Sequence, residues 1–318
     1  YDYSCVSWGH RAAQEMIGSL QYDWYAGQYV WTGFDYLGEP TPWNGISNTD
    51  HANYGWPAPK NSYFGIIDTA GLPKDTYYFY RAMWKHDDTT LHMLPAWKSD
   101  LVYTGNSKGV PVVVYTNAHK VKLEFTDTNG QTREIGTKEF TEKTTENGYK
   151  WRIYEGADKE GADYMNLYFT WYVPYADGTL TATAYDVNGN EIEKTVGRNQ
   201  VTTFGDAAKL DAEADRTEIK ADGKDLSYIT VDIKDAKDNE VANATDRVSF
   251  SVEGPGEIVG CDNGNSIDFQ PYDEDNRAAF SGKMVAIVRS TGEDGEIRVT
   301  ASADGLASDT VVINASGA

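Results

Sequence analysis

The stretch that decides the fold is Gln28-Tyr29-Val30-Trp31-Thr32-Gly33-Phe34, a short run of aromatic and β-branched residues. This composition predicts a β-strand. A loop rich in Gly, Pro and Asn follows over residues 38–61, and residues 63–67 then predict a second short extended piece. The type of fold therefore depends on the elements that flank this strand and its long loop.

A helix is predicted on each side of the strand and loop. Ser7 can cap the first helix. Its apolar face recurs at the spacing of 3.6 residues per turn, at Trp8, Ala12, Ala13, Met16, Ile17, Leu20 and Trp24. Pro73 favours the first turn of the second helix, which continues through Trp84. Helix, strand, loop and helix is the order of an α/β barrel, but a barrel needs about eight such units. Residues 1–95 therefore predict the end of a TIM barrel, with the aromatic residues 77–80 packed against it.

The remainder of the chain predicts two all-β domains, over residues 96–205 and 206–318. Residues 110–115, 120–125, 226–234 and 247–252 have the composition or the alternation of strands. Asp127-Thr128-Asn129-Gly130 and Asp186-Val187-Asn188-Gly189 predict hairpin turns, because Asn-Gly readily adopts positive φ. The expected fold class is multidomain: the end of a TIM (β/α)8 barrel followed by two all-β immunoglobulin-like sandwich domains.

Charge and composition exclude several classes of partner. The net charge is −21, from 28 Lys and Arg against 49 Asp and Glu, so we expect no nucleic-acid partner. No stretch approaches the roughly 20 apolar residues that cross a bilayer, so no membrane span is expected. The five histidines are dispersed without zinc-ligand spacing, so we expect no metal and no cofactor. The chain opens on Tyr1 rather than Met, as a piece of something longer would.

The run Trp31-Thr32-Gly33-Phe34-Asp35-Tyr36-Leu37-Gly38-Glu39-Pro40-Thr41-Pro42-Trp43 resembles the last barrel strand and following loop of family 2 glycoside hydrolases, most closely bacterial β-galactosidases. Residues 62–75 continue this resemblance into the last barrel helix. Residues 114–123 are similar to the accessory sandwich of these enzymes. Residues 221–226 and 254–264 resemble their bacterial immunoglobulin-like domain.

The resemblance implies retaining hydrolysis of terminal β-D-galactosides by two carboxyl groups about 5 Å apart. Both catalytic glutamates are expected upstream of Tyr1, so the chain alone is predicted to be inactive. The pairs Asn190-Glu191 and Asn239-Glu240 lie in polar stretches of the β domains, and we interpret them as turn residues.

Four residues are predicted to bind substrate. Trp31 matches the tryptophan at the floor of the galactose subsite, where a flat indole suits the apolar face of a pyranose. Asp35 can accept hydrogen bonds from sugar hydroxyls or brace the loop. Glu39 and Trp43 lie in the long loop, with Trp56, at the barrel face that binds ligands. Packing is the alternative for all of them: a core position for Trp31 and loop contacts for the others.

Two further functions stay open beside that of a β-galactosidase portion. The chain can be a stand-alone carbohydrate-binding or adhesive module, or a spacer. An isolated quarter of a barrel would leave its Trp-rich faces in water. Residues 1–95 are therefore predicted to pack on a sandwich domain, on another copy of the chain or on the upstream part of the same enzyme. By resemblance, the location is the exterior or the cell surface of a bacterium.

Overall fold

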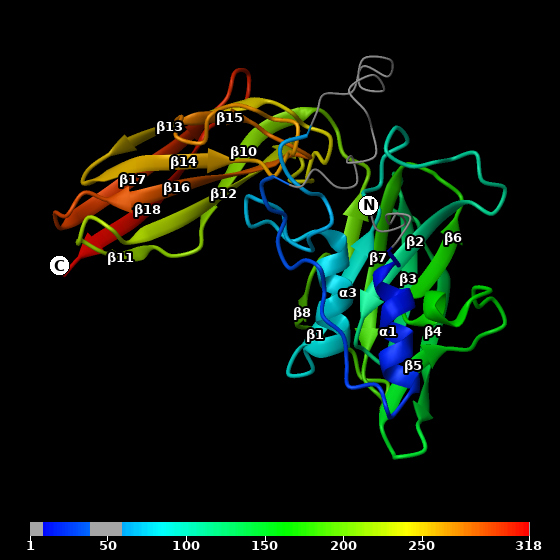
Figure 1. Cartoon of the computed structure of the whole chain (residues 1–318). Helices are drawn as coiled ribbons and strands as arrows, with labels where there is room; N and C mark the ends of the chain where they lie inside the picture. The colour runs from blue at the N-terminus through cyan, green and yellow to red at the C-terminus, as the bar shows by residue number, and fades with distance from the viewer. Residues whose placement is uncertain (1–8, 39–58, 318) are drawn as a thin grey trace, which may run out of the picture. The chain divides into compact units, whose positions relative to one another are not determined.

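The structure, a computed structural model, describes residues 9–38 and 59–317, which divide into two compact units (Figure 1). The first unit contains the described residues of Tyr1–Gly33 and Pro73–Thr203. The second contains those of Phe34–Leu72 and Phe204–Ala318. Within the described residues, no helix combines the length and the apolar character needed to cross a membrane.

The first unit is built on two facing sheets. Its helical segments are α1 (Ala12–Gln21), α3 (Asp75–Trp84) and the 3-10 turn η2 (Asp163–Asn166). Its strands are β1 (Thr89–Leu94), β2 (Val110–Thr116), β3 (Lys120–Asp127), β4 (Thr132–Thr144), β5 (Lys150–Tyr154), β6 (Phe169–Val173), β7 (Gly178–Tyr185), β8 (Thr195–Val196) and β9 (Gln200–Thr202). The strand orders are β6-β2-β1-β8 and β5-β4-β3-β7-β9, with antiparallel neighbours except for the parallel pair β1 and β8.

Side chains from both sheets meet in one core, so the first unit is a β-sandwich. Leu91 and Val112 come from one sheet, and Leu123 and Leu180 from the other. Strand β3 alternates between buried and partly buried residues along its first six positions, as expected when one face covers a core. The predicted sandwich is confirmed here.

Both predicted Asn-Gly turns are confirmed. Gly130, between β3 and β4, has a φ of +80°, and Gly189 has a φ of +84°. In the first turn, Asp127 Oδ1 accepts hydrogen bonds from the N–H groups of Asn129 and Gln131, at 2.8 and 2.9 Å. The aspartate thus fixes the turn that the glycine permits.

Helix α3 is confirmed, whereas α1 is shorter than predicted. Helix α1 begins at Ala12 and ends at Gln21. The expected cap Ser7 lies outside the described residues, and Trp24 lies beyond the helix with 77% of its side chain exposed. The prediction ran from Trp8 to Trp24, so α1 is shorter at both ends: residues 9–11 precede it and residues 22–24 follow it. Apolar spacing overestimates a helix because it does not report whether a partner surface is present.

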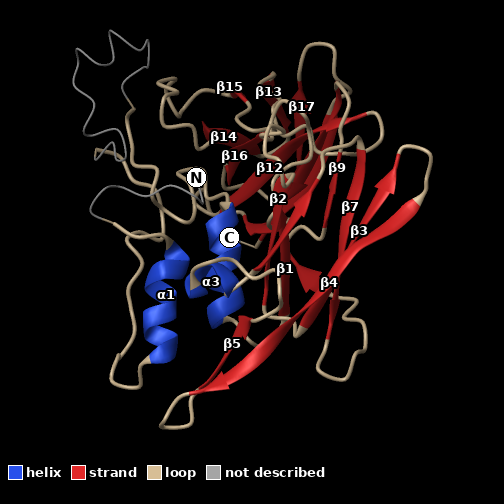
Figure 2. Ribbon diagram, turned by 90° about the vertical axis from the view of Figure 1, so that its right-hand side faces the viewer, coloured by secondary structure: helices blue, strands red, loops and turns tan. Residues whose placement is uncertain are grey.

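Helix α3 lies beside strand β1 of the first unit (Figure 2), and aromatic residues of α3 contact the sandwich, whereas their packing on a barrel stays a prediction. Phe79 meets Tyr115 edge to face, with 5.5 Å between ring centroids. Tyr78 stacks on the buried His92 at 3.8 Å, and His92 Nε2 lies 2.6 Å from Asp75 Oδ1. Burial acts to raise the pKa of Asp75, but the contacts with His92 and Arg198 outweigh it and leave this pKa lowered. These contacts hold the start and middle of α3 against strands β1 and β2.

The strand predicted over residues 28–34 is reduced to one residue in the structure. Phe34 forms a parallel bridge with Ile67, and Leu37 forms an antiparallel bridge with Asn61. Residues 9–38 and 59–95 form no barrel sheet among themselves. A strand needs a neighbour along its whole length, and the described residues give this one only the short segment 61–67. The barrel therefore stays a prediction.

The second unit is also a β-sandwich. Its strands are β10 (Ala207–Ala214), β11 (Glu218–Lys220), β12 (Leu226–Asp235), β13 (Arg247–Glu253), β14 (Gly256–Asp262), β15 (Asn276–Ala278), β16 (Lys283–Ser290), β17 (Gly295–Ser302) and β18 (Asp309–Ser316). The strand orders are β10-β12-β16-β14 and β11-β18-β17-β13-β15. Ile229 and Val231 from the first sheet share a core with Ile297 and Ile313 from the second. The strands predicted over residues 226–234 and 247–252 are confirmed as β12 and β13.

A single carboxylate organises the beginning of this second sandwich. Asp235, at the end of β12, is 4% exposed and accepts hydrogen bonds from the N–H groups of Gly205, Lys237 and Asn239 at 2.8–2.9 Å. Burial alone would raise the pKa of Asp235. The hydrogen bonds from Gly205 and from Asn239 outweigh burial and lower this pKa to about 2.

We predict that Asp235 makes stability depend on pH. An unfolded aspartate titrates near about 3.9, so the lowered native pKa contributes about 2.6 kcal/mol at neutral pH. This contribution is complete above pH of about 4 and is lost as the pH falls towards about 2. Chemical denaturation of the chain and of Asp235→Asn should give a difference in unfolding free energy that narrows over this range. A difference that stays constant between pH of about 5 and about 2 would contradict the prediction.

Candidate functional site

The predicted sugar-binding residues fall in three places. Trp31 belongs to the first unit, and its indole is 76% exposed. Asp35 belongs to the second unit and is 5% exposed. Glu39 and Trp43, together with Trp56, lie outside the described residues. Trp31 and Asp35 therefore belong to different units of the fold.

Asp35 braces two backbone segments of the second unit. Its Oδ1 accepts a hydrogen bond of 2.8 Å from the N–H of Gly65. Its own N–H donates to the carbonyl oxygen of Ile67, also at 2.8 Å. These bonds are what the bracing alternative requires, whereas a contact between Asp35 and a sugar stays a prediction.

The same two segments approach too closely for a side chain at position 65. A Cβ on Gly65 would lie 2.2 Å from the backbone nitrogen of Asp35 and 2.4 Å from the carbonyl carbon of Phe34. Further along, Ser62 donates from its N–H to Tyr36 O at 3.0 Å, and its Oγ accepts from Tyr36 N–H at 3.1 Å. Glycine at position 65 is thus a requirement of this pairing.

Residues 60–68 are held in turn by a loop of the C-terminal sandwich in the same unit. The N–H of Lys60 donates to Ser266 O at 2.8 Å, and Lys60 Nζ lies 4.4 Å from the ring centroid of Tyr272. Gly264 has a φ of +71° and lies against the Asp68 carboxylate. A Cβ added to Gly264 would lie only 2.1 Å from Asp68 Oδ2, so there is no room for a side chain at this position. The segment that pairs with Asp35 is therefore anchored to the loop between β14 and β15.

A buried cation closes that loop. Arg277 has no exposed surface; it donates to Asp268 Oδ2 at 2.8 Å and to the carbonyl oxygens of Gln270 and Pro271 at 2.8 and 2.7 Å. Burial acts to raise the pKa of Asp268, but the Gln270 N–H and the Arg277 guanidinium lower it below its ordinary value. Removing one member of such a pair leaves the other charge buried, at a cost of roughly 3–5 kcal/mol.

Sequence reasoning missed these anchoring residues. An isolated glycine within an extended run indicates a close backbone approach, so Gly65 carried a usable signal. The sequence contained no comparable signal for Lys60 or Arg277, because their partners lie far away in the sequence or are backbone carbonyl oxygens. Across residues 9–38 and 59–317, no group of three His, Cys, Asp or Glu side chains is arranged to hold a metal.

We predict that Gly65→Ala opens the pairing of residues 34–38 with 60–67. The added methyl group collides with backbone atoms, so the Asp35 and Gly65 hydrogen bonds are lost at about 1 kcal/mol each. Amide hydrogen exchange in peptides covering both segments should accelerate by roughly 30-fold, because about 1.4 kcal/mol corresponds to a factor of ten. Gly33→Ala is the matched control, because a Cβ there meets nothing within 4 Å. Equal exchange in the two variants would show that the close approach is not required.

Two family models match separate stretches of the chain. Residues 107–193 match a domain of unknown function, DUF4982. Residues 210–312 match the glycoside hydrolase family 2 C-terminal domain 5. Together these two matches cover most of both sandwiches.

Relatives match over nearly the whole chain. The β-galactosidase BoGH2A of Bacteroides ovatus is 33% identical over 99% of this chain and 31% of its own length. A putative β-glucuronidase of Formosa agariphila is 29% identical over 95% of this chain and 25% of its own length. The crystal structure of a β-glycosidase from Bacteroides vulgatus superposes with a TM-score of 0.65 at 27% identity, over 89% of this chain and 30% of that one. The chain spans less than a third of the length of each of these proteins.

Proposed function

Because the chain is the C-terminal part of a glycoside hydrolase family 2 enzyme, we propose that it supplies one wall of the sugar site of a retaining β-galactosidase that cleaves terminal β-D-galactosides. The observation that carries this proposal is the 33% identity to a β-galactosidase over 99% of the chain. The matched relatives are bacterial proteins, and we propose the exterior or the surface of a bacterial cell as the location.

The same proposal assigns residues 1–95 to the end of a TIM barrel, and both sandwiches to the immunoglobulin-like class. Support for the barrel comes from the parallel bridge between Phe34 and Ile67, which is followed by helix α3. Parallel strands, each followed by a helix, are the repeating unit of such a barrel.

Trp31 is the proposed platform for the sugar ring. It is 76% exposed within the first unit, which leaves part of its surface available to a ligand there. A flat, exposed indole can cover the apolar face of a pyranose. Asp35, Glu39 and Trp43 are the other proposed sugar-binding residues, and Asp35 also braces its own segment of the second unit through Gly65.

The catalytic carboxylates are proposed to lie upstream of Tyr1. Support comes from the two Asn-Glu pairs of this chain, which occupy turns in the sandwiches. Glu191 forms an isolated bridge with Tyr185, and Glu240 Oε1 accepts from Lys283 Nζ at 3.1 Å. The two pairs follow the turns after strands β7 and β12, so each belongs to a hairpin of a sandwich rather than to the end of a barrel strand.

We predict that the chain alone does not hydrolyse nitrophenyl β-galactoside, whereas a chain extended upstream to a whole barrel does. In the extended enzyme, Trp31→Ala should lower kcat/KM by roughly 10- to 100-fold, or about 1.4–2.7 kcal/mol. Tyr103→Ala is the matched control, because Tyr103 is an equally exposed aromatic residue (76%) outside residues 1–95, and its loss should leave kcat/KM unchanged.

Each contrary result has a distinct meaning. Activity of the chain alone would refute the upstream placement of the carboxylates and direct mutation to Asp35, Glu39 and Asp68. Preference of the extended enzyme for nitrophenyl β-glucuronide would refute the galactoside assignment. Galactose binding by an extended chain without hydrolysis would favour the binding-module alternative.

A partner surface is proposed on the exposed aromatic residues of the first unit. Tyr29 is fully exposed, and Trp24 is 77% exposed. Such apolar area in water favours association, so the upstream part of the enzyme or another copy of the chain should cover it. Light scattering should show the isolated chain self-associating. A compact monomer, free of any other polypeptide, would contradict this proposal.

A further inference from the structure

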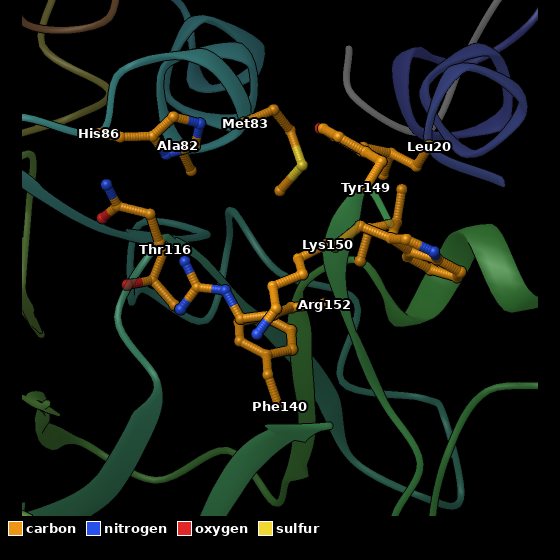
Figure 3. Close-up of a pocket in the computed structure, with 12 residues that line it drawn as sticks. Leu20, Ala82, Met83, His86, Thr116, Phe140, Tyr149, Lys150 and Arg152 are labelled. Carbon is orange, nitrogen blue, oxygen red and sulfur yellow. The ribbon is translucent and has the colours of Figure 1, made fainter. Parts of the chain in front are cut away.

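A cavity of about 90 Å³ in the first unit has an unusual charge (Figure 3). His86, Lys150 and Arg152 line it, and none of its lining residues is an aspartate or a glutamate. The whole chain carries 49 acidic residues against 28 Lys and Arg. The side chains lining this cavity that can carry a charge at neutral pH are all basic, whereas the chain as a whole is strongly acidic.

Arg152 is the cation whose charge is not already balanced by a contact. The Lys150 ammonium is paired with Glu142 at 2.6 Å. Arg152 stands opposite Glu142 in the β4–β5 pairing, yet within residues 9–38 and 59–317 its guanidinium makes no hydrogen bond or ion pair. Burial lowers the pKa of Arg152, and the charge of Glu142 only partly offsets this effect. No atom of Arg152 is among the buried polar atoms without a partner, so water reaches the guanidinium. An anionic ligand that replaced this water would give the guanidinium a charged acceptor.

The walls of the cavity suit a small anion attached to a ring. Met83 and Phe140 supply apolar surface, which strengthens an ionic hydrogen bond by excluding water. In Figure 3 the side chains of Arg152 and His86 extend into the same space, below and beside Met83. Tyr149 also lines the cavity and is 52% exposed, so it offers an aromatic face towards solvent.

We propose that this cavity binds the carboxylate of an acidic sugar, a hexuronate, with the carboxylate on Arg152 and the ring beside Tyr149. The planar fork of a guanidinium matches a carboxylate with two parallel hydrogen bonds. The volume is enough for a carboxylate and several water molecules. The cavity lies within the first unit, between helices α1 and α3 and strands β4 and β5, and does not depend on which glycoside the complete enzyme cleaves.

Calorimetric titration of the 318-residue chain with glucuronate and galacturonate tests the proposal. Saturable binding is expected for both. Arg152→Gln should weaken it at least tenfold, and Arg152→Lys, which keeps the charge but loses the fork, should weaken it less. Arg133→Gln is the matched control: Arg133 is an exposed arginine of β4 outside the cavity, and its loss should leave the affinity unchanged.

Two further ligands distinguish the contribution of the carboxylate charge from that of the sugar ring. Galactose has the ring without the carboxylate and should not bind the cavity, whereas acetate has the charge without the ring and should bind at least tenfold more weakly than glucuronate. Absence of uronate binding, full affinity in Arg152→Gln, or equal affinity for acetate and glucuronate would overturn the proposal. If Arg152→Gln fails to fold, the exposed His86→Gln should still weaken uronate binding severalfold, and unchanged affinity there would overturn it as well.

Discussion

The backbone segments 34–38 and 60–67 lie so close together that residue 65 has no room for a side chain. This approach lets the Asp35 carboxylate bond the Gly65 N–H and lets Asp35 N–H reach Ile67 O. It also places Lys60 at the end of the pairing, where its N–H bonds Ser266 of the C-terminal sandwich. The stretch that follows Trp31 thus owes its position to contacts made more than twenty-five residues later in the chain, and then to a separate sandwich.

The buried Arg277 shows how that sandwich can hold the segment firmly. A buried ion pair contributes little net stability, because desolvation offsets the attraction. Its effect is on geometry: the guanidinium bonds Asp268 and two carbonyl oxygens and lies 5.2 Å from the Tyr272 ring centroid. Lys60 contacts that same ring. The charge therefore fixes the shape of a loop whose other side anchors the 60–68 segment.

The sequence predicted those parts of the fold that depend on local patterns. Strand β12 was predictable because its core face alternates, and the Asp127 turn because Gly130 permits positive φ. The C-terminal end of α1 was overestimated, since apolar spacing continues to Trp24 without a surface to pack on. The barrel strand needed neighbours that spacing cannot supply. In the candidate site, Trp31 and Asp35 were predicted from a motif, whereas the supports of Asp35 depend on distant residues.

Tryptophan illustrates why composition alone could not separate core from site. Trp97 has no exposed surface, donates from Nε1 to Ala176 O at 2.8 Å and packs on Tyr175, so its indole is fully used by the first sandwich. Trp31, in the same Trp-rich part of the chain, is 76% exposed. An indole whose N–H and both faces are satisfied within the fold has nothing left for a ligand. Trp31 keeps its apolar surface in water and so can bind a ligand, but exposure alone does not single it out, because Trp24 is 77% exposed as well. The motif around Trp31 is what makes it the candidate for sugar binding.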